Sequence, residues 1–450
     1  MKNNKYEIDM CNGTIMDKLI SFAFPLMLSG ILQLMFNAVD IIVVGRFSGS
    51  QALAAVGSTT ALINVFVNLF IGISLGANVL AARFYAAGRE EEMSQTVHTA
   101  ITLALISGVV MAFVGVLFAK GALELMGTPD DVIGQSTLYM RIYFMGMPFF
   151  MLYNYGAAIL RAVGDTKRPL FFLIISGCIN AGLNLIMVIG FHLDVAGVAI
   201  ATIISQCVSC ILVLRCLCRT QGSYQLHFSK LCIKEVYLKQ IFQVGIPAGI
   251  QSTVINFSNA LLQSSVNSFG ATAMAGYTAA NNLLGFLYVS VNSVTQACMS
   301  FTSQNFGVGK YKRMDRVLMD CLILSVSVAA VLGCGVYFFG SQILTIYTKE
   351  PDVVACGLEI LSITTVPYFL CGIMDLFPGA LRGMGYSSVP MILSVIGTVG
   401  MRILWIFVFF PLHRSLYFLF ISYPASWLAT IIMQVICYYF VRKKCLKKMV

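Results

Sequence analysis

The sequence predicts an all-α polytopic membrane protein, with twelve transmembrane helices in two six-helix lobes related by a pseudo-two-fold axis along the membrane normal. Three observations lead to this fold class. The chain is strongly apolar and carries few charges. Twelve of its apolar stretches are long enough to cross a bilayer. Several motifs of the first half return in the second half, in the same order and at nearly one spacing.

The composition excludes a soluble globular domain. Of the 450 residues, 58% are hydrophobic and 11% are charged, whereas a typical soluble domain has about 25% charged residues. Lipid is therefore the expected solvent for most of the surface. Residues 1–18 are polar and lack the pattern of a cleavable signal peptide, so we expect the first apolar stretch to remain as a helix. Most of the 14 cysteines lie in apolar stretches, where we interpret them as packing residues rather than metal ligands.

Twelve stretches match the roughly 20 apolar residues that a helix needs to cross about 30 Å of hydrocarbon. The expected helices cover residues 18–43, 52–78, 95–119, 132–157, 169–190, 195–217, 240–265, 273–300, 317–346, 353–380, 389–411 and 415–440. The segment Gln240–Gly309 contains no charged residue and is too long for one helix. We therefore place a turn at Asn267–Gly270.

The basic residues are distributed unevenly around these helices. If the N-terminus is cytoplasmic, 23 of the 29 Lys and Arg residues fall in cytoplasmic segments and 4 fall in outer loops. This bias follows the positive-inside rule, so we expect both termini in the cytoplasm and the helices in the plasma membrane. The net charge of +10 is then explained by the Lys and Arg residues of the cytoplasmic segments. It implies contact with membrane lipids and no nucleic-acid partner.

An internal repeat relates the two halves of the chain. The pattern Leu160-Arg161-x-x-Gly164-x4-Pro169 returns in the second half as Leu381-Arg382-x-x-Gly385-x4-Pro390. At the same spacing, Gly49–Ala55 matches Gly270–Gly276 and Gly88 matches Gly309. With small insertions, Pro25 matches Pro247 and Ala201–Gln206 matches Ala429–Gln434. Several matches in order are hard to obtain from low-complexity apolar sequence alone.

The repeat predicts two lobes, residues 1–225 with the first six helices and residues 226–450 with the last six. Six is an even number, so both lobes begin on the same side of the membrane and the repeat is parallel. The polar segment from Arg219 to Lys239 connects them. Two similar lobes suit alternating access in a transporter, whereas a receptor has no evident need for the duplication.

Of the acids within the predicted spans, we single out Asp40 and Asp375 as functional candidates. An unpaired charge at membrane depth costs roughly 2.5–3.5 kcal/mol on insertion scales, so such residues usually bind ions, protons or substrate. The alternative for Asp40 is a position near the outer interface where it caps a bend.

Three polar residues extend the candidate ion site. Asn180 and Asn184 are four residues apart in the fifth span and share a helix face, and Thr202 lies in the sixth span. Amide and hydroxyl oxygens with the Asp40 carboxylate suit a proton or a hard cation such as Na⁺, and we expect no metal site beyond this one. The alternative is that these side chains only join helices by hydrogen bonds.

Other polar side chains are unusually frequent in the spans for lipid-facing helices. We expect some of them to line a substrate cavity: Gln33, Asn37, Asn64, Asn68, Asn154, Asn256, Asn259, Asn281, Asn282 and Asp375. Aromatic residues and methionines could accept flat organic cations there, although lipid-facing packing explains most of them.

Several motifs of enzymes and motors are absent from the sequence. It has no G-x4-G-K-[ST] loop, and its four histidines form no H-E-x-x-H motif. We therefore expect no cofactor, no catalytic residues and no ATPase subunit. Transport would then be driven by a gradient of H⁺ or Na⁺.

The repeat and three motifs together resemble the multidrug and toxic compound extrusion (MATE) family, of bacterial type. The motifs are Asn37-Ala-Val-Asp40-x4-Gly45, Gly49-x-x-Ala-Leu-Ala-Ala-Val-Gly57 and Leu160-Arg-Ala-Val-Gly-Asp165-Thr. The resemblance covers essentially the whole chain. It implies an antiporter that exports cationic organic compounds in exchange for H⁺ or Na⁺, by alternating access of the two lobes.

The resemblance also implies roles for individual residues. The family's first-lobe cation site is similar to Asp40, Asn180, Asn184 and Thr202 here, and an acid that matters in some members is similar to Asp375. Some of those members carry a Glu in the seventh helix, where this chain has none and Asn256 lies near the expected place. We therefore favour ion coupling in the first lobe.

Three other functions fit the sequence less well. A lipid-precursor flippase of the same superfamily would need a cationic cavity, but Arg141 and Arg402 are the only arginines well inside the spans. An integral-membrane enzyme would need acids or histidines clustered at one membrane face. A passive channel would show no dependence of flux on a counter-ion gradient.

Overall fold

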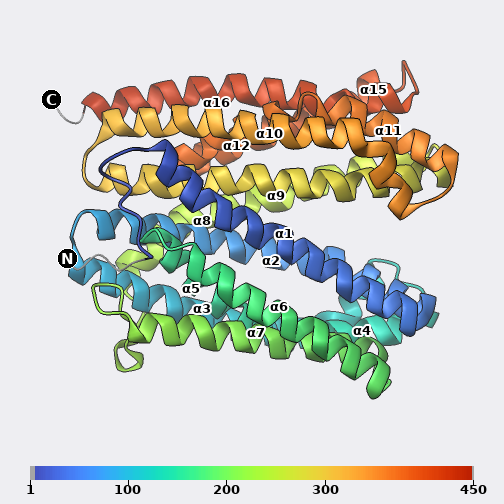
Figure 1. Cartoon of the computed structure of the whole chain (residues 1–450), viewed down its shortest axis with the longest axis horizontal. Coiled ribbons are helices and arrows are strands. Elements are labelled where there is room, and N and C mark those ends of the chain that lie inside the picture. The colour runs from blue at the N-terminus through green and yellow to red at the C-terminus, as the bar shows by residue number, and fades with distance from the viewer. Residues whose placement is uncertain (1–5, 448–450) are drawn as a thin grey trace. The chain divides into compact units, whose positions relative to one another are not determined.

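The computed structural model describes residues 6–447, and within this range all regular structure is helical (Figure 1). The helices of the first half are α1 (Met16–Phe47), α2 (Gly49–Ala86), α3 (Glu90–Leu125), α4 (Asp130–Met145), α5 (Met147–Ala162), α6 (Lys167–Leu185), η1 (Ile186–Gly190) and α7 (Asp194–Arg219). A short helix, η2 (Phe228–Lys230), follows in the connection. The helices of the second half are α8 (Glu235–Asn267), α9 (Ala271–Gly307), α10 (Tyr311–Tyr347), α11 (Pro351–Thr365), α12 (Tyr368–Gly383), α13 (Ser388–Ser394), η3 (Val395–Gly400), α14 (Met401–Leu404), η4 (Trp405–Phe409), α15 (Leu416–Phe420) and α16 (Ser422–Lys447).

Among the described residues, eight or nine helical spans have the length and apolarity to cross a membrane, and three further helical segments occupy the other predicted spans. Eight are long and apolar enough by themselves, and the bent pair α11–α12 makes a ninth. The long helices α8 and α9 and the pair α4–α5 fill the remaining three places. The predicted all-α, multi-pass fold is therefore confirmed, and the similarity to solved structures reported below extends this to the two-lobe, twelve-helix arrangement.

Two predicted spans are broken rather than continuous. The chain interrupts the span predicted at 132–157 at Gly146, and Pro148 then occupies the first turn of α5. It bends the span predicted at 353–380 by 49° between α11 and α12, next to Pro367. Proline lacks the N–H that would continue the hydrogen-bond ladder. A hydropathy pattern cannot detect such a break, because both sides of it are apolar.

The chain divides into two compact units. The first unit contains the residues up to Asp9 and Leu28–Ile246, and the second contains Met10–Met27 and Pro247–Val450. Both divisions within helices fall beside a proline, in α1 just after Pro25 and in α8 directly before Pro247. A proline inside a helix weakens its hydrogen-bond ladder and favours a change of direction. That residues 1–225 and 226–450 form the two lobes that move during transport stays a prediction.

Within each unit the helices bury their polar backbone and pack through apolar side chains. In the first unit α3 packs on α4 and α5, and α6 packs on α7. In the second unit α9 contacts α10, α11 and α12, and α12 contacts α16. Aromatic rings fill the second unit's core, where Tyr423 lies 5.9 Å from Phe420 and 5.6 Å from Trp427 between ring centroids.

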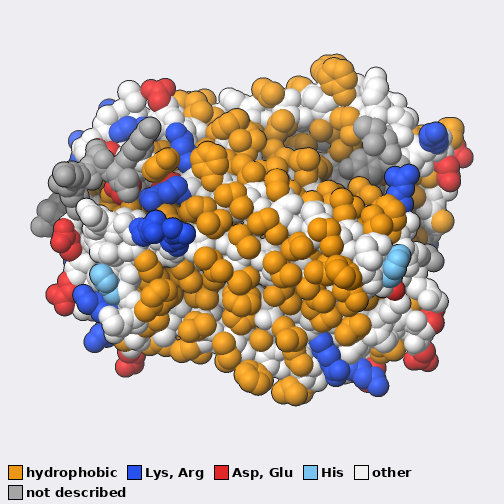
Figure 2. All heavy atoms as spheres, turned by 60° about the horizontal axis from the view of Figure 1, so that its bottom comes forward, with side chains coloured by type: hydrophobic (Ala, Val, Ile, Leu, Met, Phe, Trp, Pro, Cys, Tyr) orange, Lys and Arg blue, Asp and Glu red, His pale blue; other side chains and the backbone are white. Residues whose placement is uncertain are grey.

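The helix surfaces are apolar where lipid would contact them. Figure 2 shows a broad field of hydrophobic side chains, with most charged side chains towards its two ends. On α3, Phe113, Leu117 and Phe118 are each about two-thirds exposed, and Phe171 and Ile211 project in the same way from α6 and α7. Large apolar side chains rarely gather in the open on soluble proteins. The protein is therefore an integral membrane protein.

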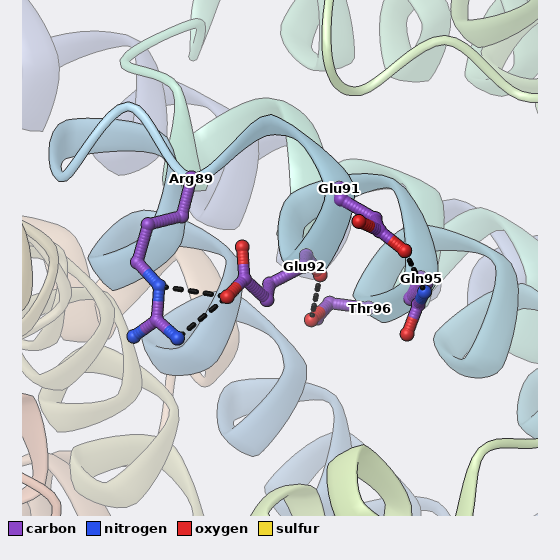
Figure 3. Close-up of polar contacts among 5 residues, drawn as sticks. All are labelled: Arg89, Glu91, Glu92, Gln95 and Thr96. Atoms are coloured by element: carbon purple, nitrogen blue, oxygen red, sulfur yellow. Dashed lines mark hydrogen bonds and ion pairs between the residues drawn. The ribbon is translucent and has the colours of Figure 1, made fainter.

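The turn between α2 and α3 is held by local charges (Figure 3). Gly88 adopts φ of +68°, which favours glycine. Arg89 then donates to Glu92 Oε1 from Nε at 2.9 Å and from Nη2 at 2.5 Å, and Gln95 donates to Glu91 at 3.0 Å. Glutamates in the first turn also complement the positive end of the α3 dipole. This ion pair is solvent-exposed and adds little stability.

The equivalent turn of the second unit holds the N-terminal segment instead. Gly309 repeats the glycine with φ of +71°. Lys310 Nζ donates to Cys11 O at 3.0 Å and to Asn12 Oδ1 at 2.7 Å, and Asn305 Nδ2 donates to Met10 O at 3.1 Å. Residues 10–12 are thus anchored on the second unit.

The residues just before them are anchored on the first unit. Glu7 accepts hydrogen bonds from Tyr85 Oη at 2.7 Å and from Tyr224 Oη at 2.6 Å. Burial and the Glu7 carboxylate both raise the pKa of Tyr224, so its phenol stays protonated and continues to donate.

Candidate cation site

The candidate cation site lies in the first unit, where α1, α6 and α7 bring four predicted side chains together. Asn184 Nδ2 donates to Asp40 Oδ1 and also lies 3.3 Å from Asn180 Oδ1. Asn180 Nδ2 in turn lies 3.4 Å from Thr202 Oγ1, which donates to Val198 O of its own helix at 2.9 Å. One chain of hydrogen bonds therefore connects Asp40 with α7. The role of these residues in ion coupling stays a prediction.

The helical period explains why two of these residues share a face. Asn180 and Asn184 are one turn apart on α6 and are 6% and 0% exposed. Asn184 Oδ1 is buried and has no hydrogen-bond partner within the described part of the chain. An unsatisfied buried acceptor is costly. A proton donor or a cation at this point would satisfy it, and the surrounding carboxylate, amide and hydroxyl oxygens are ligands suited to Na⁺.

Gly177 allows α1 to approach α6 at this site. A Cβ atom on residue 177 would overlap the ring atoms of Phe36. The Phe36 ring therefore occupies the space that any other residue at 177 would fill. Because Phe36 and Asp40 are one helical turn apart, the contact fixes the height of Asp40 beside Asn184.

The backbone of α6 changes its hydrogen-bonding pattern directly after Asn184. The five residues Ile186–Gly190 form a π turn, η1. Such turns occur mostly inside α-helices and frequently at functional sites. Beyond it, His192 and Asp194 both have positive φ, at 54° and 47°. The connection to α7 is therefore a tight, locally strained turn.

Two tyrosines near this site were not predicted from the sequence. Tyr139 and Tyr143 of α4 lie within electrostatic range of Asp40, and their rings stack with centroids 6.1 Å apart. Their spacing of four residues on one helix was the available signal. Aromatic residues are so frequent in the spans that this spacing does not stand out.

The predicted cavity residues come from both units of the chain. Of these residues, those that are exposed within the described structure are Gln33, Asn37, Asn64, Asn256, Asn281 and Asn282, and those that are partly buried are Asn68, Asn154, Asn259 and Asp375. Asn154 Nδ2 donates to Phe150 O in its own helix at 2.8 Å, and Asn259 Oδ1 accepts from Arg402 at 2.7 Å. A substrate cavity lined by these residues stays a prediction.

The described residues contain no group of three or more His, Cys, Asp or Glu side chains that could hold a metal ion. The oxygens around Asp40 are thus a different kind of candidate site, with a single carboxylate and neutral partners.

Comparison with known families identifies the chain. The model of the family described as MatE matches residues 25–186 and 247–408, two segments of equal length with one in each half. The chain belongs to the MatE family. Members of the MatE family are membrane transporters, so this chain is a transporter and not an enzyme. The two matched segments also agree with the internal repeat.

Named relatives and solved structures extend the MatE match over the whole chain. The chain is 31% identical over 433 residues to "Probable multidrug resistance protein YoeA" of Bacillus subtilis, covering 94% of this chain and 93% of the relative. It is 22% identical to "Multidrug export protein MepA" of Staphylococcus aureus, covering 86% of each. The structure titled "Crystal structure of MATE in complex with MaL6" superposes with a TM-score of 0.92 at 19% identity, covering 99% of this chain and 100% of that one.

Proposed function

We propose that this MatE transporter is a secondary active antiporter that exports cationic organic compounds in exchange for H⁺ or Na⁺. The hydrogen-bonded cluster of Asp40, Asn184, Asn180 and Thr202 is the observation that supports this most directly. The relatives named as multidrug resistance and multidrug export proteins support the substrate class. The helices lie in the plasma membrane with both termini in the cytoplasm, as the distribution of Lys and Arg predicts.

The energetics favour exchange over simple release. Moving one positive charge outward against a membrane potential of 100 mV costs roughly 2.3 kcal/mol. One H⁺ or Na⁺ moving inward cancels this cost. The chemical gradient then drives export, with about 1.36 kcal/mol for each pH unit when the ion is a proton.

The amide of Asn184 can serve either ion. It donates to Asp40 in the structure, which suits a carboxylate without a bound ion. A proton on Asp40 makes this group a donor, and a rotated Asn184 amide would then accept through Oδ1. A bound Na⁺ would need the same oxygen. A proton would thus reverse the hydrogen bond between α1 and α6, and Na⁺ would replace it with coordination to both oxygens. We propose that this change opposes drug binding by linkage.

The proposed cycle needs few partners. Small organic cations are the cargo and membrane lipids surround the helices. Ion exchange supplies the energy, so no ATPase subunit, cofactor or nucleic acid takes part. The exposed amides at Asn37, Asn64, Asn281 and similar positions are candidates for the cavity that receives the cargo.

A lipid-precursor flippase receives no support from the arginines within the spans. Arg141 is exposed and donates to Val116 O at 3.2 Å. Arg402 is buried and donates to Asn259. The two belong to different units. Neither is part of an arginine cluster that could receive a pyrophosphate group.

Transport into proteoliposomes tests the proposal. The vesicles contain the purified chain and report uptake of a fluorescent organic cation, with a pH gradient or a Na⁺ gradient imposed separately. We expect one gradient to drive dye movement in the wild type and Asp40→Asn to lower it by about 10- to 100-fold. Asp131→Asn is the matched control, because Asp131 is an exposed acid in the first turn of α4. Dye movement by Asp40→Asn with normal dependence on the gradient would falsify the assignment of the site.

A further inference from the structure

The second unit buries an arginine within a membrane span. Arg402 belongs to α14 and is 3% exposed. Its Nη1 donates to Asn259 Oδ1 at 2.7 Å, and its guanidinium carbon lies 4.3 Å from the centroid of the Tyr423 ring. Charged residues within membrane spans are costly and usually functional. Nothing in the proposed ion exchange at Asp40 uses this one.

Arg402 has no acidic partner among the described residues. None of the ion pairs there includes it. Asp375, an acid within a span of this unit, interacts with Arg382 instead. The groups that face Arg402 are Asn259, Tyr423, and, within electrostatic range, Tyr277 and Cys371. An amide oxygen and aromatic faces hold the guanidinium, which are surroundings that also hold a mobile cation.

The repeat shows which groups of the first unit correspond to this place. The family match aligns α1 with α8 from Pro25 and Pro247 onward. In that alignment Asn259 corresponds to Asn37, and Leu262 corresponds to Asp40. Leu262 lies about one turn after Asn259 on α8 and is fully buried. The second unit therefore lacks the carboxylate of the candidate cation site.

A π turn brings Arg402 into register with Asn180. The helix after Pro169 continues regularly to Asn180, whereas the chain after Pro390 passes through η3 before it reaches Arg402. A π turn takes up one residue more than an α turn. Arg402 is also one residue farther from Pro390 than Asn180 is from Pro169. The extra residue is thus absorbed in η3, and Arg402 corresponds to Asn180.

Of the two other members of the cluster, Thr202 is unchanged in the second unit, whereas Asn184, four residues after Asn180, corresponds to Ile406. Thr430 corresponds to Thr202 through the shared Ala-Thr-Ile-Ile pattern. Its Oγ1 lies 3.1 Å from Thr398 Oγ1, one turn before Arg402. The second unit thus keeps the threonine of the site, with an arginine in place of Asn180, an isoleucine in place of Asn184 and a leucine in place of the acid.

We propose that Arg402 is a built-in cation that occupies, in the second unit, the place where the first unit binds its exchangeable ion. This inference rests on the proposed ion exchange at Asp40 and adds that the exchange uses the first unit alone. The tethered guanidinium fills the site, and its charge excludes a second mobile cation.

Ion counting on the purified full chain tests this inference. The probes are radioactive sodium binding and proton uptake in weakly buffered detergent solution. Leu262→Asp places a carboxylate at the position equivalent to Asp40. Because Arg402 neutralises it, we expect no additional ion. Leu262→Asp with Arg402→Asn removes the tethered charge, and we expect one additional ion per chain. Leu262→Asp with Arg402→Lys keeps a charge and should behave as Leu262→Asp alone.

Two outcomes would overturn the inference. One is an additional ion in Leu262→Asp alone. The other is none in the folded double variant Leu262→Asp with Arg402→Asn. Adding Asp40→Asn to each background separates the two proposals. If Asp40→Asn does not lower the number of bound ions per chain by one, the coupling site is refuted. The comparison of the Leu262 variants with each other remains valid in that case.

Chemical rescue covers the case in which the Leu262 variants do not fold. Arg402→Ala leaves a space of guanidinium shape beside Asn259 and Tyr423. We expect free guanidinium to raise the thermal midpoint of Arg402→Ala relative to its effect on the wild type. Urea is the control, because it has nearly the same shape without the charge. Equal effects of urea and guanidinium would refute a requirement for a cation at this place.

Discussion

The two units have similar helices but carry opposite charges at equivalent places, a carboxylate in the first and a guanidinium in the second. In the first, α6 holds two buried amides, of which Asn184 donates to the Asp40 carboxylate, and Asn184 Oδ1 is left without a partner among the described residues. In the second, the equivalent helix presents Arg402 to Asn259, and a leucine replaces the acid. The threonine of the site remains the same. Duplication therefore provides two similar scaffolds, and a few buried polar side chains decide which of them can exchange an ion.

The largest expected difference between the units concerns their acids. Asp40→Asn should lower gradient-driven transport by about 10- to 100-fold, which corresponds to coupling energies of about 1–3 kcal/mol. Asp375→Asn in the second unit should leave the dependence on the ion gradient intact, because Asp375 interacts with Arg382 rather than with the candidate site. The measurement is the initial rate of dye uptake at several gradients. Loss of gradient dependence in Asp375→Asn alone would reverse the assignment.

The asparagines that contact the two charges should differ in a similar way. Asn184→Ala removes both the donor to ion-free Asp40 and the Oδ1 that a bound ion would use. We expect the loss of the oxygen to dominate and ion binding to weaken by up to about tenfold, since a hydrogen bond contributes about 0.5–1.5 kcal/mol. Asn259→Ala removes the acceptor of Arg402 and should lower thermal stability without changing ion affinity. Ion binding and thermal unfolding on both variants check this pair. A comparable loss of ion affinity in Asn259→Ala contradicts the difference between the units.

Gly177→Ala should disturb the first site through packing alone. The new methyl group would overlap the Phe36 ring, and such overpacking typically costs about 1–3 kcal/mol. We expect lower thermal stability and a shifted ion affinity, both partly restored by Phe36→Leu. Gly182→Ala on the same helix is the control, because a Cβ there meets nothing within 4 Å. Equal effects of the two alanine substitutions would show that helix propensity, rather than the Phe36 contact, is responsible.

The smallest expected effect separates the two threonines. Thr202→Val removes a weak contact with Asn180 and should reduce ion affinity by less than about tenfold, since a neutral hydrogen bond contributes about 0.5–1.5 kcal/mol. Thr430→Val breaks the pair with Thr398 and should affect stability only. Parallel titrations of the two variants with the coupling ion check this. A change of ion affinity in Thr430→Val would mean that the second unit takes part in binding.

Hydropathy and the repeat predicted the fold because membrane spans need long apolar helices, whatever their detailed packing. They also indicated which polar residues of α6 and α7 to examine, since Asn180 and Asn184 are spaced by one helical turn. The breaks at Gly146 and Pro367 were missed because both sides of each break are equally apolar. The proline in each case was the available signal.

The relation between Arg402 and Asn180 could not be read from the sequence for a different reason. A π turn changes the helix register by one residue and leaves no compositional trace in Val395–Gly400. Without the structure, the spacing of the repeated Leu-Arg-x-x-Gly motif aligns Arg402 with Ala181 rather than with Asn180. A sequence alignment alone would therefore place the Arg402 side chain on a different face of the helix.

The membership of Met10–Met27 in the second unit has a consequence for how the chain is made. Phe22 packs edge-to-face on Phe301, and Asn305 holds Met10 O, yet these partners lie far apart in the sequence. A ribosome builds the chain from its N-terminus, so the first half of α1 enters the membrane long before α9 exists. It must wait there without its native neighbours. The second unit therefore closes only after synthesis of its own helices, and a gene split in the connection after α7 would leave the second fragment without one of its packing surfaces. The order of insertion and the order of assembly thus differ in this protein, and long-range contacts of this kind are those that form late in folding.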